Sequence, residues 1–191
     1  MKKALIAAAS VTTLIAITPA LAQAQTAPMG VYGNLGYSSA KADDLNLGAI
    51  QGRIGYRANN WLGVEGELAV GVKDDKSRQV VAGTPVETRV ELKHQEAIYA
   101  VGFAPITPQA DLLARVGYGN TKAKASATAV GVGGPVTVSE TADGDSWNFG
   151  VGAQYHWDAQ NGVRVDYTRH EFRDDDAGHA DVWSIAYNRR F

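Results

Sequence analysis

Hydrophobic residues alternate with small, polar or charged residues along most of this chain. The segment 61–72 is the clearest case, because its leucines and valines share one parity whereas Glu65 and Glu67 share the other. A period of two predicts β-strands whose two faces differ in polarity. The same alternation recurs in 31–38, 47–57, 90–103, 111–119, 146–158, 162–170 and 181–191. We therefore predict an all-β chain of eight amphipathic strands.

The links between these segments alternate between short and long. The short links are 58–60, 104–110 and 159–161, and the long links are 39–46, 73–89, 120–145 and 171–180. An even number of antiparallel strands with short turns at one rim and long loops at the other is typical of an outer-membrane barrel. We therefore predict an eight-stranded, antiparallel, up-and-down transmembrane β-barrel whose short turns and two ends face the periplasm.

The first residues have the pattern of a secretory signal peptide. A basic start at 1–3 precedes an apolar run over 4–17, and the small residues of 18–22 provide a cleavage site. We expect cleavage after Ala22, or alternatively after Ala24, which leaves 23–191 as one barrel domain. An uncleaved anchor is disfavoured, because the apolar run is shorter than the roughly 20 residues that span a bilayer.

Composition narrows the remaining possibilities. The chain has 18 basic and 20 acidic residues and a formal net charge of -2, which argues against a nucleic-acid partner. It contains no cysteine, so disulfides do not hold it together. No later segment is long and apolar enough for a membrane helix, so a closed barrel is the membrane-spanning structure left open to it.

One face of the predicted strands carries charges of both signs, namely Arg53, Glu65, Glu67, Glu96, Arg115, Arg164 and Asp166. A basic residue facing lipid at the bilayer midplane costs roughly 2–4 kcal/mol, so we expect these side chains to form a charge network in the lumen. For 90–103 this interpretation places Glu96 inside and both Tyr99 and Phe103 outside. The alternative is a secreted, lipocalin-like carrier with its apolar face inside.

Aromatic residues gather near the ends of the predicted strands, where the membrane interfaces would lie. The predicted aromatic girdle comprises Tyr37, Tyr56, Phe103, Tyr118, Trp147, Tyr155, Trp157, Trp183 and Phe191. The alternative for these aromatic side chains is the core of an ordinary β-sandwich. A sandwich core does not collect charge on one face of its strands, which favours the girdle.

Two segments carry a resemblance to a known family, the run 163–167 (VRVDY) and the closing 183–191 (WSIAYNRRF). With the signal, the eight strands and the long alternate loops, the chain resembles the small outer-membrane barrels typified by OmpA and OmpX. The resemblance implies a Gram-negative outer membrane, contact with its lipid and lipopolysaccharide, and recognition by the barrel assembly machinery. The assembly signal would be Trp183, Ile185, Tyr187 and Phe191. Arg189 occupies a position that family members commonly fill with an apolar or aromatic residue.

The resemblance implies a structural, adhesion or surface-interaction role. An eight-stranded barrel is just wide enough for side chains to fill, so we expect inward charges to pair and close the lumen. Two long loops, around 82–85 and 131–135, read as hairpins that extend their strand pairs and offer a surface for a protein partner. The alternatives are a narrow, porin-like conductor of small solutes and a lipid-modifying enzyme of the outer membrane.

No catalytic or cofactor site is predicted. Ser146, Ser184, His156 and His170 share the inner face, and no G-x-S-x-G motif is present. The segment 170–179 collects carboxylates and imidazoles, which are ligands for divalent cations. Its spacing does not fit an EF-hand, which favours a solvated acidic turn without metal.

Overall fold

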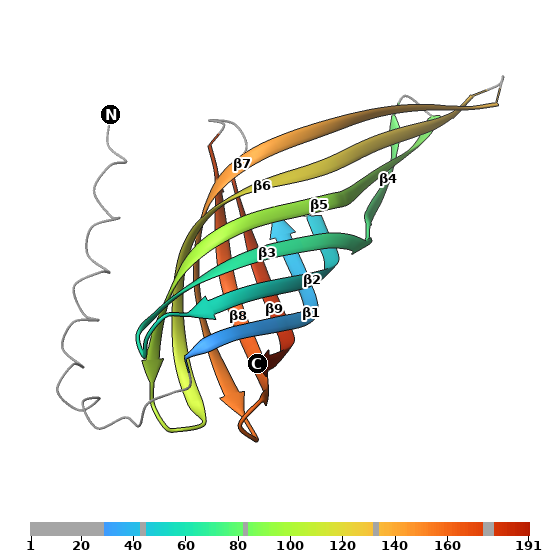
Figure 1. The fold of residues 1–191 in the computed structure, drawn as a ribbon. Coiled ribbons are helices and arrows are strands. Elements are labelled where there is room, and N and C mark those ends of the chain that lie inside the picture. The colour runs from blue at the N-terminus through green and yellow to red at the C-terminus, as the bar shows by residue number, and fades with distance from the viewer. Residues whose placement is uncertain (1–28, 43–44, 82–83, 132–133, 174–177) are drawn as a thin grey trace, which may run out of the picture.

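The computed structural model describes residues 29–42, 45–81, 84–131, 134–173 and 178–191. They form the strands β1 (Gly30–Ala42), β2 (Leu45–Arg57), β3 (Leu62–Lys73), β4 (Asp75–Val81), β5 (Thr84–Pro105), β6 (Ala110–Gly131), β7 (Gly134–His156), β8 (Asn161–Phe172) and β9 (His179–Arg190). Each strand pairs antiparallel with its neighbours, and the β1–β9 and β3–β5 pairings close the sheet into a barrel (Figure 1). No helix among the described residues could cross a membrane. The predicted signal peptide, 1–22, lies outside the described residues.

The nine strands occupy eight positions around the barrel. β3 and β4 both pair with β5, β3 along its second half and β4 along its first. β4 therefore continues β3 beyond a break at Asp74, and together they form one position. The prediction of an eight-stranded, up-and-down, all-β barrel is confirmed.

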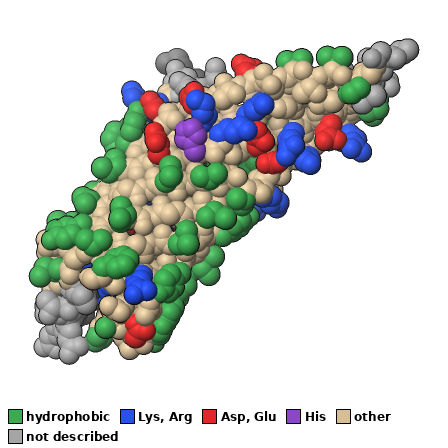
Figure 2. All heavy atoms as spheres, turned by 45° about the vertical axis from the view of Figure 1, so that its right-hand side comes forward, with side chains coloured by type: hydrophobic (Ala, Val, Ile, Leu, Met, Phe, Trp, Pro, Cys, Tyr) green, Lys and Arg blue, Asp and Glu red, His purple; other side chains and the backbone are tan. Residues whose placement is uncertain are grey.

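Inside and outside follow the alternation of the sequence. Leu68 and Ile54 are 54% and 67% exposed on the outer wall, whereas their sequence neighbours Glu67 and Arg53 are buried. Figure 2 shows hydrophobic side chains spread over the barrel wall, with most charged side chains of that face gathered toward the end that carries the long loops. A barrel with an apolar wall and a polar interior is the arrangement that lipid requires.

Three strands are much longer than the others. β5, β6 and β7 contain 22, 22 and 23 residues, whereas β8 and β9 contain 12 each. With β4 they extend past the barrel as a protruding sheet, which we define as β4 together with 84–92, 121–131 and 134–144 (Figure 1). In this sheet β7 begins at Gly134, whose φ of +107° strongly favours glycine.

The faces of 96–103 are the reverse of our prediction. Glu96 is exposed on the outer wall, whereas Tyr99, Val101 and Phe103 are buried in the lumen. The prediction that Glu96 belongs to the lumen charge network is therefore wrong. The prediction that Phe103 belongs to the aromatic girdle is also wrong.

Neighbouring strands explain this reversal. Residues paired across two strands project to the same side of the sheet, and Val101 is paired with the inward-facing Arg115. The two rings are useful inside because guanidiniums stack on them, Arg115 lying 4.3 Å from the ring centre of Tyr99 and Arg57 4.1 Å from that of Phe103. The segment carries apolar residues on both faces, so alternation alone could not orient it.

Two β-bulges lie on neighbouring strands where the barrel passes into the protruding sheet. Val72 of β3 has no partner in β2, and Lys93 of β5 has no partner in β6. A bulge adds one residue to a strand and bends it. In β5 the bulge changes which residues face inward. On the barrel side of Lys93 the inward side chains are odd-numbered, as at Gln95, and in the protruding sheet they are even-numbered, as at Leu92.

Candidate functional site

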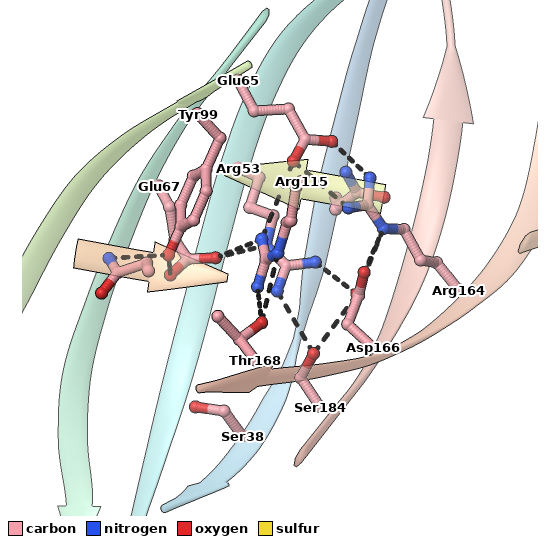
Figure 3. Close-up of polar contacts among 12 residues, drawn as sticks. Ser38, Arg53, Glu65, Glu67, Tyr99, Arg115, Arg164, Asp166, Thr168 and Ser184 are labelled. Carbon is pink, nitrogen blue, oxygen red and sulfur yellow. Dashed lines mark hydrogen bonds and ion pairs between the residues drawn. The ribbon is translucent and has the colours of Figure 1, made fainter. Parts of the chain in front are cut away.

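A layer of charged side chains crosses the middle of the lumen (Figure 3). We define this ion layer as Arg53 of β2, Glu65 and Glu67 of β3, Arg115 of β6, and Arg164 and Asp166 of β8. Each is at most 7% exposed. The strands bring these residues together because each one lies at an inward position of the alternation, close to mid-strand.

Arg53 connects two carboxylates that come from opposite sides of the barrel. Its Nε donates to Glu67 Oε2 at 2.6 Å and its Nη1 donates to Asp166 Oδ2 at 2.6 Å. Its Nη2 donates to the Ser184 hydroxyl at 3.2 Å. The guanidinium is therefore held from three sides.

The other two arginines complete the connection. Arg115 Nη1 lies 2.9 Å from Glu67 Oε2 and 3.7 Å from Glu65 Oε2. Arg164 Nε donates to both oxygens of Asp166 at 2.8 and 3.1 Å, and its two terminal nitrogens pair with Glu65, Nη2 at 3.2 Å. Every carboxylate in the ion layer thus contacts at least two arginines.

Three guanidiniums face three carboxylates, so the formal charge of the ion layer sums to zero. Neutral groups occupy the remaining hydrogen-bonding positions: Tyr32 donates to Glu65 at 2.8 Å, and Gln95 and Tyr99 donate to Glu67 at 3.1 and 3.3 Å. A buried charge is tolerated when it is both paired and hydrogen-bonded. The ion layer meets both conditions.

A second polar cluster lies nearer the short-turn end, and our sequence analysis missed it. Arg57 Nη1 and Nη2 each lie 3.1 Å from an oxygen of Asp111, which also accepts from Gln154 at 2.7 Å. Arg190 approaches the same carboxylate at 3.4 Å. The sequence did carry a sign that both side chains face the lumen. Arg57 has the same parity as the inward Arg53, and Asp111 stands at the first inward position of its strand.

Glycines create the room that these long side chains need. A Cβ on Gly150 would lie 2.9 Å from Cγ and Nε of Arg115 and 2.8 Å from the Thr168 hydroxyl. A Cβ on Gly117 would lie 2.4 Å from the Tyr99 ring. The glycine-rich inner face is therefore a steric requirement of the ion layer.

The fold and this polar interior agree with a comparison of sequences. A family model for the outer membrane protein beta-barrel domain matches residues 7–191. The chain belongs to this family. As an outer-membrane barrel it is located in the outer membrane of a Gram-negative bacterium, as the resemblance to the OmpA and OmpX barrels implies.

Solved structures share the fold of this outer-membrane barrel. Ail, the attachment invasion locus protein of Yersinia pestis, is 20% identical with a TM-score of 0.55, and the match covers 85% of this chain and 99% of Ail. A second Ail structure gives 19% identity and a TM-score of 0.56, over 86% and 100% of the two chains. OprG of Pseudomonas aeruginosa is 11% identical with a TM-score of 0.52, over 88% and 98%. A search of curated proteins found no significant match.

The aromatic side chains of the outer wall lie near the two ends of the barrel, where the membrane interfaces would be. Apart from Phe103, the residues predicted as a girdle lie on the outer wall: Tyr37, Tyr118, Trp147 and Trp183 toward the long-loop end, and Tyr56, Tyr155, Trp157 and Phe191 toward the short-turn end. The Tyr118 and Trp147 rings pack edge to face with centroids 5.5 Å apart. Tyr167, which we did not include, packs 5.0 Å from Trp183.

The serines and histidines considered for catalysis are all buried in the barrel: Ser146, Ser184, His156 and His170. The Ser146 hydroxyl donates to the amide of Asn148 at 2.8 Å, and Ser184 accepts from Arg53. Among the described residues no group of three potential metal ligands occurs. Asp174, Asp175 and Asp176 lie outside the described part of the chain.

Proposed function

We propose that this outer-membrane barrel is a non-enzymatic surface-interaction protein, whose protruding sheet binds a partner protein outside the cell. The observation that carries the proposal is the unpaired outer edge of β7. Residues 134–144 pair with β6 on one side, and no described strand pairs with their other side. An open strand edge accepts an added strand through main-chain hydrogen bonds.

The two free edges of the protruding sheet differ in character. β4 carries Lys76 and Arg78, and charged side chains on an edge discourage strand addition. The β7 edge has no basic residue over 134–144, and its two acidic residues, Glu140 and Asp143, lie nearer the barrel than the tip. Toward the tip, Val136 and Val138 are 66% and 69% exposed. We therefore assign the partner to β7 rather than to β4.

The same proposal includes a closed lumen. The ion layer spans the interior with paired, buried side chains, and the Arg57–Asp111 cluster forms a second barrier below it. Because an eight-stranded barrel is just wide enough for side chains to fill, buried and paired groups of this size oppose a continuous water-filled path. This geometry favours an anchor over the alternative of a narrow conductor, and the outer wall would contact lipid and lipopolysaccharide.

Ail has the same fold and is described as an attachment invasion locus protein, which fits a role at the cell surface. One Ail structure is a complex with the heparin analogue sucrose octasulfate. In the present barrel, three basic residues of the protruding sheet, Arg78, Arg89 and Lys122, are paired with carboxylates, as in Arg78–Glu87 and Lys122–Asp143 at 2.8 and 3.4 Å. These pairs lower the attraction for a polyanion, so we favour a protein partner.

Adhesion of whole bacteria tests the proposal. Cells displaying the wild type or V136K/V138K are applied to epithelial monolayers and to immobilised matrix proteins. We expect the wild type to adhere and the variant to lose adhesion at least tenfold, because two lysines block the β7 edge. Val80→Lys on the β4 edge serves as the matched control and should adhere normally.

Protease treatment of intact cells verifies that each variant is displayed with its hairpins outside. Equal adhesion by wild type and V136K/V138K at equal display would disprove the assignment to β7. Adhesion no greater than that of cells without the barrel would disprove the proposed function as a whole.

A further inference from the structure

The inner surface above the ion layer is apolar, although barrel interiors in this class are usually polar. This apolar cup, at the long-loop end of the lumen, is lined among others by Ala40, Leu92, Ala123, Phe172, Ala180 and Val182. These residues come from β1, β5, β6, β8 and β9, so the cup extends around the barrel. The bulge at Lys93 is what turns Leu92 inward.

The apolar cup contains a partly open cavity of about 170 Å³. Three alanines, Ala40, Ala123 and Ala180, face it from three different strands. Larger side chains at these positions would fill the space, as they do in an ordinary hydrophobic core. The alanines therefore leave a volume that the side chains of the described residues do not fill.

Water is a poor occupant of this space. A buried water needs two to four polar partners, and the polar side chains of the wall are Gln95, Thr121 and His170. Gln95 already donates its amide to Glu67 at 3.1 Å, which leaves Thr121 and His170, the minimum number of side-chain partners for one buried water. Apolar cavities of about 150 Å³ stay dry and take up molecules of the size of benzene.

We propose that the apolar cup binds a small, uncharged and mainly apolar molecule, such as a single aromatic ring with at most one polar substituent near His170. The ion layer forms the floor of the site, so a ligand would enter from the exterior and stay there. This inference is independent of the proposed partner at β7. Either can fail without affecting the other.

Methyl NMR in lipid nanodiscs tests the proposal with toluene as the probe. Toluene also dissolves in lipid, so the readout must separate the lumen from the wall. Methyl groups of Leu92 and Val182 report on the cup, and those of Leu68 and Val70 report on lipid contact. We expect saturable shifts at the first pair and only small, linear shifts at the second.

Filling the cavity supplies the control. Ala180→Leu should weaken the saturable binding at least tenfold, whereas Ala153→Leu, the same change on the outer wall, should leave it unchanged. Folding of each variant is checked by the heat-dependent shift in gel mobility that a detergent-resistant barrel shows. If Ala180→Leu does not fold, Ala123→Leu replaces it. Saturable shifts at Leu92 that persist in a folded, filled variant would overturn the proposal. So would wild-type shifts that stay linear up to the solubility of toluene.

Discussion

Arg164 and Asp166 stand two residues apart on the same face of β8, and Arg164 Nε donates to both oxygens of the Asp166 carboxylate at 2.8 and 3.1 Å. Side chains two apart in a strand point the same way, so a charged pair of this kind can form before any other strand is in place. The pair then supplies one cation and one anion to the lumen. Arg164 reaches across to Glu65 and Asp166 to Arg53.

Arg164→Met should destabilise the barrel by about 3–5 kcal/mol, because it leaves Glu65 buried with its main counter-charge removed. The double variant E65Q/R164M should be less destabilised than R164M alone, since it restores a neutral ion layer. Urea unfolding in lipid vesicles, followed by tryptophan fluorescence, measures both. A double variant with a lower unfolding free energy than R164M would contradict the pairing of Arg164 with Glu65.

The wild type should give no stable, long-lived conductance in planar bilayers. Replacing Arg53, Glu67 and Arg115 together by alanine should open the ion layer, because these side chains fill the centre of the lumen. We expect measurable openings only in the triple variant. A large, lasting conductance from the wild type would show that the lumen is open.

Gly150→Ala should destabilise the barrel by about 1–3 kcal/mol, the usual cost of overpacking. Its methyl group would meet the Arg115 side chain at 2.9 Å. Gly66→Ala is the matched control, because a Cβ there has no atom within 4 Å. If both variants unfold at the same urea concentration, the steric role of Gly150 is wrong.

The carboxylate of Asp158 caps a short turn between β7 and β8. The side chain of Asn161 and the backbone N–H groups of Gln160 and Asn161 donate to it, and these hydrogen bonds lower the pKa of Asp158 below its ordinary value of 3.8. A lowered folded-state pKa means that the stabilisation is complete above 3.8 and is lost as the pH falls through the folded value.

Asp158→Ala should therefore be less stable than the wild type near neutral pH, with the difference shrinking in strong acid. Asp158→Asn keeps an oxygen acceptor but does not titrate. Its stability relative to Asp158→Ala should depend less on pH. Unfolding free energies across an acid series measure these differences, and a wild-type advantage that does not change with pH would refute the assignment.

The sequence allowed the barrel to be predicted because one face of most strands carries charge. Around Glu65 and Arg164 the alternation is unambiguous, since no membrane wall would accept those side chains. In β5 the rule failed because its one charge near the barrel, Glu96, lies outside. The partners within the ion layer were beyond prediction, since Glu65 and Arg164 are 99 residues apart and only barrel closure brings them together.

Lys93 has no backbone partner in β6, and the effect of this bulge extends beyond a bend in one strand. If Lys93 took a regular place in the alternation, the membrane-embedded half of β5 would stay in place and the upper half would turn by one step, so that Lys93 and Glu91 faced the opening while Leu92 faced water. The apolar lining of the entrance would then become polar and hydrated. One residue held outside the ladder can thus decide which solvent fills the entrance, while the belt below keeps its contact with the bilayer.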